Sequence, residues 1–223
     1  MGHEKEYCRT SKEMTGGGPR TGRPNRLQAA IAFALLLSAG SAFAQQDGGA
    51  QSVELRQGKV VTTSVSRKGV KVRGGKAEIL LDAPLDKVMA VVEDYGNYQK
   101  FLPFFHVSRT LAKRGANAIA YMEARILNGT HTIWVEVTFR DRGSKGTSRV
   151  IEGKMNRGNV NQLSLRWEAA AVEGEKTLLS FEFFVDPDLP VPSSVISNQN
   201  AVSARRTVRA LRKRLYRIIS KTK

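Results

Sequence analysis

The chain has few of the residues that build covalent or metal chemistry. Its single cysteine, Cys8, lies near the amino terminus, so no internal disulfide can form and no thiol site is available in the rest of the chain. Three histidines in 223 residues, without paired histidine or carboxylate spacing, argue against a stable metal site. The sequence has no Gly-x-Ser-x-Gly elbow, phosphate-binding loop or dinucleotide fingerprint. We therefore expect neither a metal nor another cofactor.

Long apolar runs are also missing. The longest, residues 27–39, falls short of the roughly 20 residues that span a bilayer. It follows three arginines and precedes Ala42-Phe43-Ala44, which is typical of a secretory signal peptide, and its length argues against a retained anchor. We expect residues 1–44 to be removed near Ala44, residues 45–52 to form a flexible leader, and the mature protein to be exported to the periplasm or cell envelope.

Positive charge is in excess. The chain has 36 Lys and Arg against 20 Asp and Glu, a net charge of +16. Six of the basic and three of the acidic residues precede residue 45, so a charge of +13 remains after it. Such a balance favours acidic partners. For an exported protein we expect an anionic membrane surface and no nucleic acid.

Residues 81–103 indicate a strand end, a helix and an aromatic corner. Pro84, after Leu81-Asp82-Ala83, suits a helix start because its missing N–H is not needed there. The helix is indicated by apolar residues at helical spacing, Val88, Val91 and Val92. The corner is the sequence Asp94-Tyr95-Gly96-Asn97-Tyr98 followed by Phe101-Leu102-Pro103.

This pattern resembles the strand-to-helix step of the START-like, helix-grip (SRPBCC) superfamily, most closely its coenzyme Q-binding and polyketide-cyclase branch. Met89 stands where the family pattern usually has tryptophan. The resemblance runs from about residue 55 to 219. It implies an α+β helix-grip domain over residues 53–223, with a curved antiparallel sheet wrapped around a long carboxy-terminal helix and a cavity between them.

The rest of the sequence fits such a fold. Alternating apolar and polar residues predict antiparallel strands around 121–125, 131–140, 151–155, 162–171 and 179–185. Turn signals lie at Asn128-Gly129, Asp141-Arg142-Gly143, Asn156-Arg157-Gly158-Asn159 and Glu173-Gly174-Glu175. Prolines then end strand pairing, and an amphipathic helix follows with the apolar stripe Ala201, Ala204, Val208, Leu211, Leu215 and Ile218.

The cavity implied by the resemblance would be lined by large apolar side chains of the sheet, the corner and the last helix. We expect ligand contact from Phe101, Phe104, Ile133, Val135, Val137, Met155, Leu165, Trp167, Phe181, Phe183, Val208 and Leu211. For any single residue, ordinary core packing is the alternative.

Four polar residues are candidates for the cavity: His106, Tyr121, Glu123 and Arg125. If the shared face of residues 121, 123 and 125 points inward, Glu123 and Arg125 form a buried pair that can orient a ligand. If it points outward they are a solvated pair, which the rarity of buried charges favours. We assign no catalytic residue.

The predicted function is binding, or transport, of a hydrophobic small molecule such as a lipid or quinone in the cell envelope. One alternative is a cyclase-, aromatase- or hydrolase-like enzyme acting on an apolar substrate. Another is a basic membrane-surface interaction protein with a vestigial cavity. Contact with anionic headgroups would come from the helix face opposite the apolar stripe, Arg205, Arg209, Lys213 and Arg217, although a merely solvated face gives the same pattern.

Overall fold

The computed structural model describes residues 46–222 except 127, 128, 174 and 188. The expected signal peptide, residues 1–44, lies outside the described residues. Helix α1 (Gln46–Arg56) covers most of the segment expected to be a flexible leader. Its second half, residues 50–56, has no glycine or proline and contains good helix formers, which explains why the segment is helical rather than irregular.

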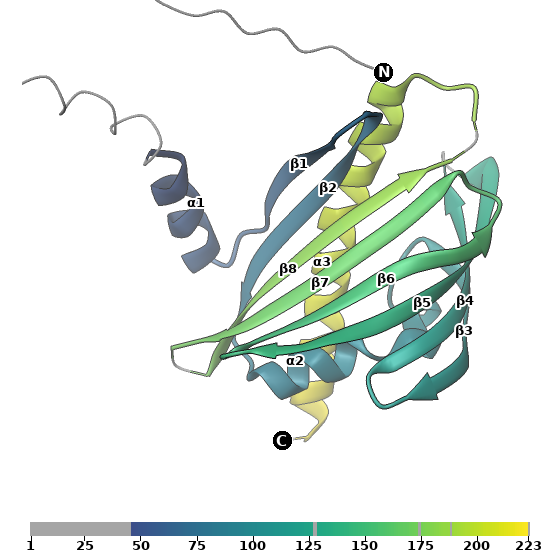
Figure 1. Cartoon of the computed structure of the whole chain (residues 1–223). Helices are drawn as coiled ribbons and strands as arrows, with labels where there is room; N and C mark the ends of the chain where they lie inside the picture. Colours follow the sequence, from purple (N-terminus) through teal and green to yellow (C-terminus); the bar gives the residue numbers. More distant parts are fainter. Residues whose placement is uncertain (1–45, 127–128, 174, 188, 223) are drawn as a thin grey trace, which may run out of the picture. The chain divides into compact units, whose positions relative to one another are not determined.

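Eight antiparallel strands form one sheet, curved around a long helix (Figure 1). The strand order is β1-β2-β8-β7-β6-β5-β4-β3, so most neighbouring strands are consecutive in the sequence and connected by short turns. The exception is the pair β2–β8, in which an early strand pairs with the last one. The strands are β1 (Val61–Arg67), β2 (Val70–Leu81), β3 (Phe105–Arg114), β4 (Asn117–Ile126), β5 (His131–Lys145), β6 (Ser148–Gly158), β7 (Gln162–Val172) and β8 (Lys176–Asp186). The predicted helix-grip α+β fold is confirmed.

The chain passes from β2 to the opposite sheet edge through α2 (Leu85–Val92) and the 3-10 helix η1 (Tyr95–Lys100). Pro84 occupies the N-cap position of α2, close to its predicted place in the first turn. The helix buries Val88, Met89, Val91 and Val92. Met89, 1% exposed, is therefore a core residue, as the resemblance to the family pattern implies.

Helix α3 (Ser193–Thr222) lies along the concave side of the sheet and packs mainly on β2 and β8. The predicted stripe is confirmed for the buried residues Ala204, Val208, Leu211 and Leu215. It is wrong for Ile218, which is 38% exposed, whereas Ile219 packs on the core. A repeat of 3.6 residues carries the inward face from Leu215 to Ile219.

Helix α3 approaches β2 so closely at Gly75 that no side chain fits there. A Cβ atom on Gly75 would lie 2.4 Å from the Ala201 Cα and 2.5 Å from the Asn200 carbonyl oxygen. Both are backbone atoms, so a larger residue would displace the helix. Gly75 thus sets the distance between the helix and the sheet at the amino-terminal half of α3.

The predicted turn at residues 141–143 is wrong. Strand β5 continues to Lys145, and one extra residue is absorbed between Asp141 and Ser144. Gly143 has a φ of 79°, and its N–H donates to the Asp141 Oδ1 at 2.8 Å. These features form a bulge, because glycine accepts the left-handed conformation that the extra residue requires.

Other turns lie close to their predicted places. The 173–175 turn separates β7 from β8, with Gly174 outside the described residues. The 156–159 turn is displaced, because β6 continues to Gly158 before the chain reverses. Asn128, in the remaining predicted turn, also lies outside the described residues.

Candidate ligand-binding site

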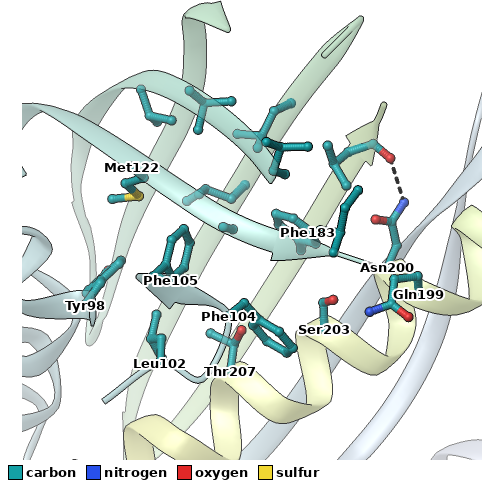
Figure 2. Close-up of a pocket in the computed structure, with 18 of the residues that line it drawn as sticks. Tyr98, Leu102, Phe104, Phe105, Met122, Phe183, Gln199, Asn200, Ser203 and Thr207 are labelled. Carbon is teal, nitrogen blue, oxygen red and sulfur yellow. Dashed lines mark hydrogen bonds between the residues drawn. The ribbon is translucent and has the colours of Figure 1, made fainter. Parts of the chain in front are cut away.

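A cavity of about 80 Å³ lies between the concave side of the sheet and the amino-terminal half of α3 (Figure 2). Most of its wall is apolar. The sheet contributes Met122, Ala124, Ile126, Ile133, Val135, Val137, Leu163, Leu165, Trp167, Phe181, Phe183 and Val185. The corner before β3 contributes Tyr98, Leu102 and Phe104, and the first residue of β3 contributes Phe105. The chain after β8 contributes Pro187, Ile196, Gln199, Asn200, Ser203 and Thr207.

Eight of the twelve predicted ligand-contact residues line this cavity: Phe104, Ile133, Val135, Val137, Leu165, Trp167, Phe181 and Phe183. Seven of them alternate along β5, β7 and β8. Because successive strand residues point to opposite faces, the period of two places these seven on the concave side. Alternation in the sequence therefore identified the inward face of these strands, whereas the cavity that this face lines was implied by the family resemblance.

The other four predicted residues do not line the cavity. Val208 and Leu211 are at most 1% exposed and pack in the core further along α3. Phe101 packs edge-on against Tyr98, with the Arg214 guanidinium 5.7 Å from its ring centre. Met155 lines a separate groove between β6 and β7.

The helix side of the cavity is polar apart from Ile196, and sequence reasoning missed it. Gln199, Asn200, Ser203 and Thr207 face the sheet from α3, with Asn200 beside Phe183 (Figure 2). Successive members of this set are one, three and four residues apart, so they lie on the same inward face of the helix as Ala204. Following that spacing towards the amino terminus, irrespective of polarity, would have found them.

Asn200 is fully buried and joins three elements. Its Nδ2 donates to the carbonyl oxygens of Arg73 on β2 and Val185 on β8, both at 3.0 Å. Ser197 accepts a hydrogen bond from the Arg73 N–H at 2.9 Å, one turn earlier on the helix. Backbone groups near the ends of these strands are therefore satisfied by α3. The Asn200 Oδ1 is buried and has no hydrogen-bond partner among the described residues.

Aromatic rings form the deep wall. Trp167 stacks on Phe181 with ring centres 4.0 Å apart, and Phe183 follows at 6.1 Å from Phe181. The Tyr98 hydroxyl donates to the Val92 carbonyl oxygen at 2.5 Å. Burial, the largest cause, raises the Tyr98 pKa well above its ordinary value. Tyr98 is the only titratable side chain among the lining residues that the structure describes, so the wall carries no charge at neutral pH.

The four polar candidates lie outside the cavity. Met122 and Ala124 point into it, so Tyr121, Glu123 and Arg125 point to the outer face of the sheet. There the Tyr121 hydroxyl donates to Glu123 Oε1 at 2.5 Å, and Glu123 Oε2 lies 2.9 Å from the exposed His106 Nε2. The inward, ligand-orienting arrangement of Glu123 and Arg125 is therefore wrong.

The predicted membrane-facing residues Arg205, Arg209, Lys213 and Arg217 are all exposed on α3. None forms an ion pair within the described part of the chain. Arg206 and Arg214 instead pack over the rings of Phe104 and Phe101. None of the described helices combines the length and the apolar character needed to cross a bilayer.

An antiparallel sheet wrapped around a long carboxy-terminal helix, with an apolar cavity between the two, defines a START-like helix-grip protein. The chain belongs to the family described as polyketide cyclase / dehydrase and lipid transport, whose model matches residues 81–212. Comparison with curated proteins gave no match.

Solved structures share the fold at low sequence identity. A STAR-related lipid transfer protein from Xanthomonas axonopodis is 14% identical, with a TM-score of 0.63 over 70% of this chain and 93% of that one. Human StAR-related lipid transfer protein 5 is 11% identical, with a TM-score of 0.59 over 78% of this chain and 95% of that one. The Streptomyces Zhui aromatase/cyclase is 15% identical, with a TM-score of 0.50 over 71% of this chain and 96% of that one.

Proposed function

We propose that this protein binds a hydrophobic small molecule of the lipid class between the sheet and α3, and carries it in the cell envelope. The cavity wall is the observation that supports this proposal, because it combines many apolar side chains with a few polar groups on one side. Apolar ligand surface buried there contributes about 25 cal/mol per Å². The family description includes lipid transport, and two of the similar structures are named as lipid transfer proteins.

The cavity has to widen to hold a lipid. Its volume of about 80 Å³ is well below the roughly 300 Å³ at which small-molecule sites begin. Phe104 and Phe183 are only half-buried and face the polar side of α3, so their rotation opens the space at least cost. We place the entrance between residues 101–107 and the amino-terminal half of α3, which ends near Arg206, whose guanidinium lies 5.9 Å over the Phe104 ring.

A catalytic function has less support. The family description includes cyclases, and one similar structure is an aromatase/cyclase. Acid–base catalysis needs a titratable group within reach of the substrate. The candidates His106 and Glu123 lie on the outer face of the sheet, and the Tyr98 hydroxyl donates its hydrogen bond to the Val92 carbonyl oxygen. Binding therefore remains the preferred function.

We further propose that residues 1–44 direct export and that the mature protein docks on anionic membranes through the basic face of α3. That face is defined by Arg205, Arg209, Lys213 and Arg217, all exposed. Each basic residue near an anionic surface contributes about 1 kcal/mol. Docking through α3 would bring the proposed entrance, beside the same helix, towards the source of the ligand.

Native mass spectrometry of protein purified from its own host tests ligand binding. We expect an apolar species of defined mass that organic extraction removes. Ala124→Leu, which adds bulk to the cavity wall, should reduce the bound fraction, whereas Ala112→Leu on the exposed part of β3 should not. If neither the purified protein nor extracted protein exposed to lipids holds a ligand, the proposal is wrong. Salt-dependent vesicle binding without any ligand would then favour the vestigial-cavity alternative.

A further inference from the structure

We infer that the ligand carries an uncharged head group that donates a hydrogen bond to the Asn200 Oδ1 atom. This inference rests on the proposed binding function. Asn200 is fully buried, lines the cavity and uses both Nδ2 hydrogens on backbone carbonyl oxygens. Its Oδ1 has no partner among the described residues. A buried acceptor left unpaired is unfavourable, and a donor on the ligand would satisfy it.

The surroundings of Asn200 indicate where the head lies. Gln199, Ser203 and Thr207 flank it on α3, while the opposite wall on the sheet is apolar (Figure 2) except for the Trp167 Nε1, a buried donor with no hydrogen-bond partner among the described residues. The Ser203 and Thr207 hydroxyls are in no hydrogen bond with another described residue, so they are available to a ligand oxygen. An amphipathic molecule would therefore place its head against α3 and its tail along β5, β7 and β8.

The head is expected to be neutral because none of the described lining residues is charged. A carboxylate or phosphate at Asn200 would be buried without a counter-ion, which is strongly unfavourable. Its oxygen atoms would also face the Oδ1 lone pairs. Fatty acids and phospholipids with buried heads therefore fit this site poorly.

The head must also be a donor. Ethers, esters and quinones present only acceptor oxygens, and these would leave the Oδ1 unpaired. A hydroxyl donates to Oδ1 and accepts from Ser203 or Thr207 at the same time. The structure therefore points to long-chain or cyclic alcohols as the ligand class.

The test uses the unmodified protein, because Asn200 also anchors α3 and its replacement would remove the hydrogen bonds that hold the helix to β2 and β8. Affinities of extracted protein are measured for three probes with the same chain: 1-dodecanol, dodecyl methyl ether and dodecanoate. A net hydrogen bond corresponds to about a fivefold difference in affinity, so we expect the alcohol to bind at least about fivefold more tightly than the ether. Dodecanoate should bind more weakly than the alcohol at neutral pH.

Nuclear magnetic resonance gives a direct readout of the same contact. We expect dodecanol to shift the side-chain amide resonances of Asn200, and the ether to shift them much less. Those of Asn198, exposed on the same helix, serve as the control. Equal affinities for alcohol and ether with the same Asn200 response would overturn the inference and leave the binding function intact. Failure of every probe to bind would instead contradict the proposed function.

Discussion

The two halves of α3 meet the same sheet in different ways. In the carboxy-terminal half, Val208, Leu211 and Leu215 are buried and join the main core, which includes α2 residues such as Met89. In the amino-terminal half, several inward positions are occupied by short polar side chains, Asn200 and Thr207 among them, beside Ile196 and Ala204. Bulky apolar residues fill the space in the first region. Short polar residues, held by specific hydrogen bonds, leave a cavity in the second.

The difference separates stability from binding along one helix. Dispersion contacts and apolar burial are greatest where side chains are closely packed. Residues around a cavity make fewer such contacts and therefore contribute less to stability. A region that opens for a ligand has to be less tightly packed than the rest. We therefore expect substitutions in the packed half to affect mainly stability, and those in the cavity half to affect mainly binding.

Leu211→Ala should produce a large loss of stability. Leu211 is 1% exposed within the packed half, and truncating a leucine in such a site typically costs about 2–5 kcal/mol. Urea unfolding measures the loss. Ser203→Ala, at the half-buried cavity wall, is the control and should change the free energy of unfolding by less than about 1 kcal/mol. Similar losses in both variants would mean that the two halves are equally packed.

Phe181→Ala and Phe183→Ala should differ although both residues line the cavity. Phe181 is 4% exposed and stacks on Trp167, so its loss should approach the roughly 3–5 kcal/mol of a core phenylalanine. Phe183 is half-buried, and we expect its truncation to cost clearly less than about 3 kcal/mol and to change ligand affinity. Urea melts of ligand-free protein measure both. Full core-like losses at both positions would reject the cavity.

Much of this arrangement could be predicted from sequence because alternation is a strong signal in half-buried strands. Val135 and Val137 on β5, and Phe181 and Phe183 on β8, were placed correctly by their period of two. Strands β1 and β3 were not predicted. They form the two edges of the sheet, and the outer part of β3 is exposed, so burial does not impose alternation there.

The polar wall could not be predicted from an apolar pattern. Asn200 lies inward because its amide satisfies carbonyl groups of Arg73 and Val185, which are distant in sequence and come together only in the folded sheet. The error at Ile218 has a simpler cause, since Ile219 continues the 3.6-residue repeat equally well. Local spacing identifies a face, and long-range backbone pairing decides which polar residues belong to it.

Arg149→Gln, on β6 and away from the cavity, should have a smaller effect on stability. Arg149 joins β6 to α2 and β5 through ion pairs with Glu93 at 3.0 Å and Asp141 at 2.7 Å. Burial alone would raise the Asp141 pKa, but hydrogen bonds from Arg149 and the Gly143 N–H outweigh it and hold the pKa below its usual value. These groups are partly exposed, so we expect a loss of about 1 kcal/mol at neutral pH.

The pH dependence of that effect follows from the direction of the shift. A carboxyl whose pKa is lower in the folded state stabilises the fold above its unfolded pKa, about 3.9 for Asp, and this stability is lost as pH falls. Urea unfolding at a series of pH values should show a steeper acid loss for the unmodified protein than for Arg149→Gln. Parallel curves would show that Asp141 does not depend on Arg149.

Charge reversal on the basic face of α3 should have the smallest effect on stability. Arg205, Arg209, Lys213 and Arg217 are exposed and unpaired within the described chain, so replacement of all four by Glu should leave the unfolding free energy within about 1 kcal/mol. Binding to anionic vesicles should fall sharply, measured by co-sedimentation. Binding of the unmodified protein should also weaken with salt, because exposed charges are screened over about 10 Å at 0.1 M.

Reversing the four charges two at a time tests which part of α3 meets the membrane. Arg205 and Arg209 lie nearer the cavity residues of α3, and Lys213 and Arg217 lie further along the packed half; Lys113 and Arg114, exposed on the β3–β4 hairpin, give a control of equal charge. If docking presents the cavity entrance to the bilayer, reversal of Arg205 and Arg209 should weaken vesicle binding most, and should also slow transfer of ligand between vesicles. Equal losses for both helix pairs would mean that the whole face docks without orienting the entrance. Unchanged binding in all variants would show that the face is only solvated.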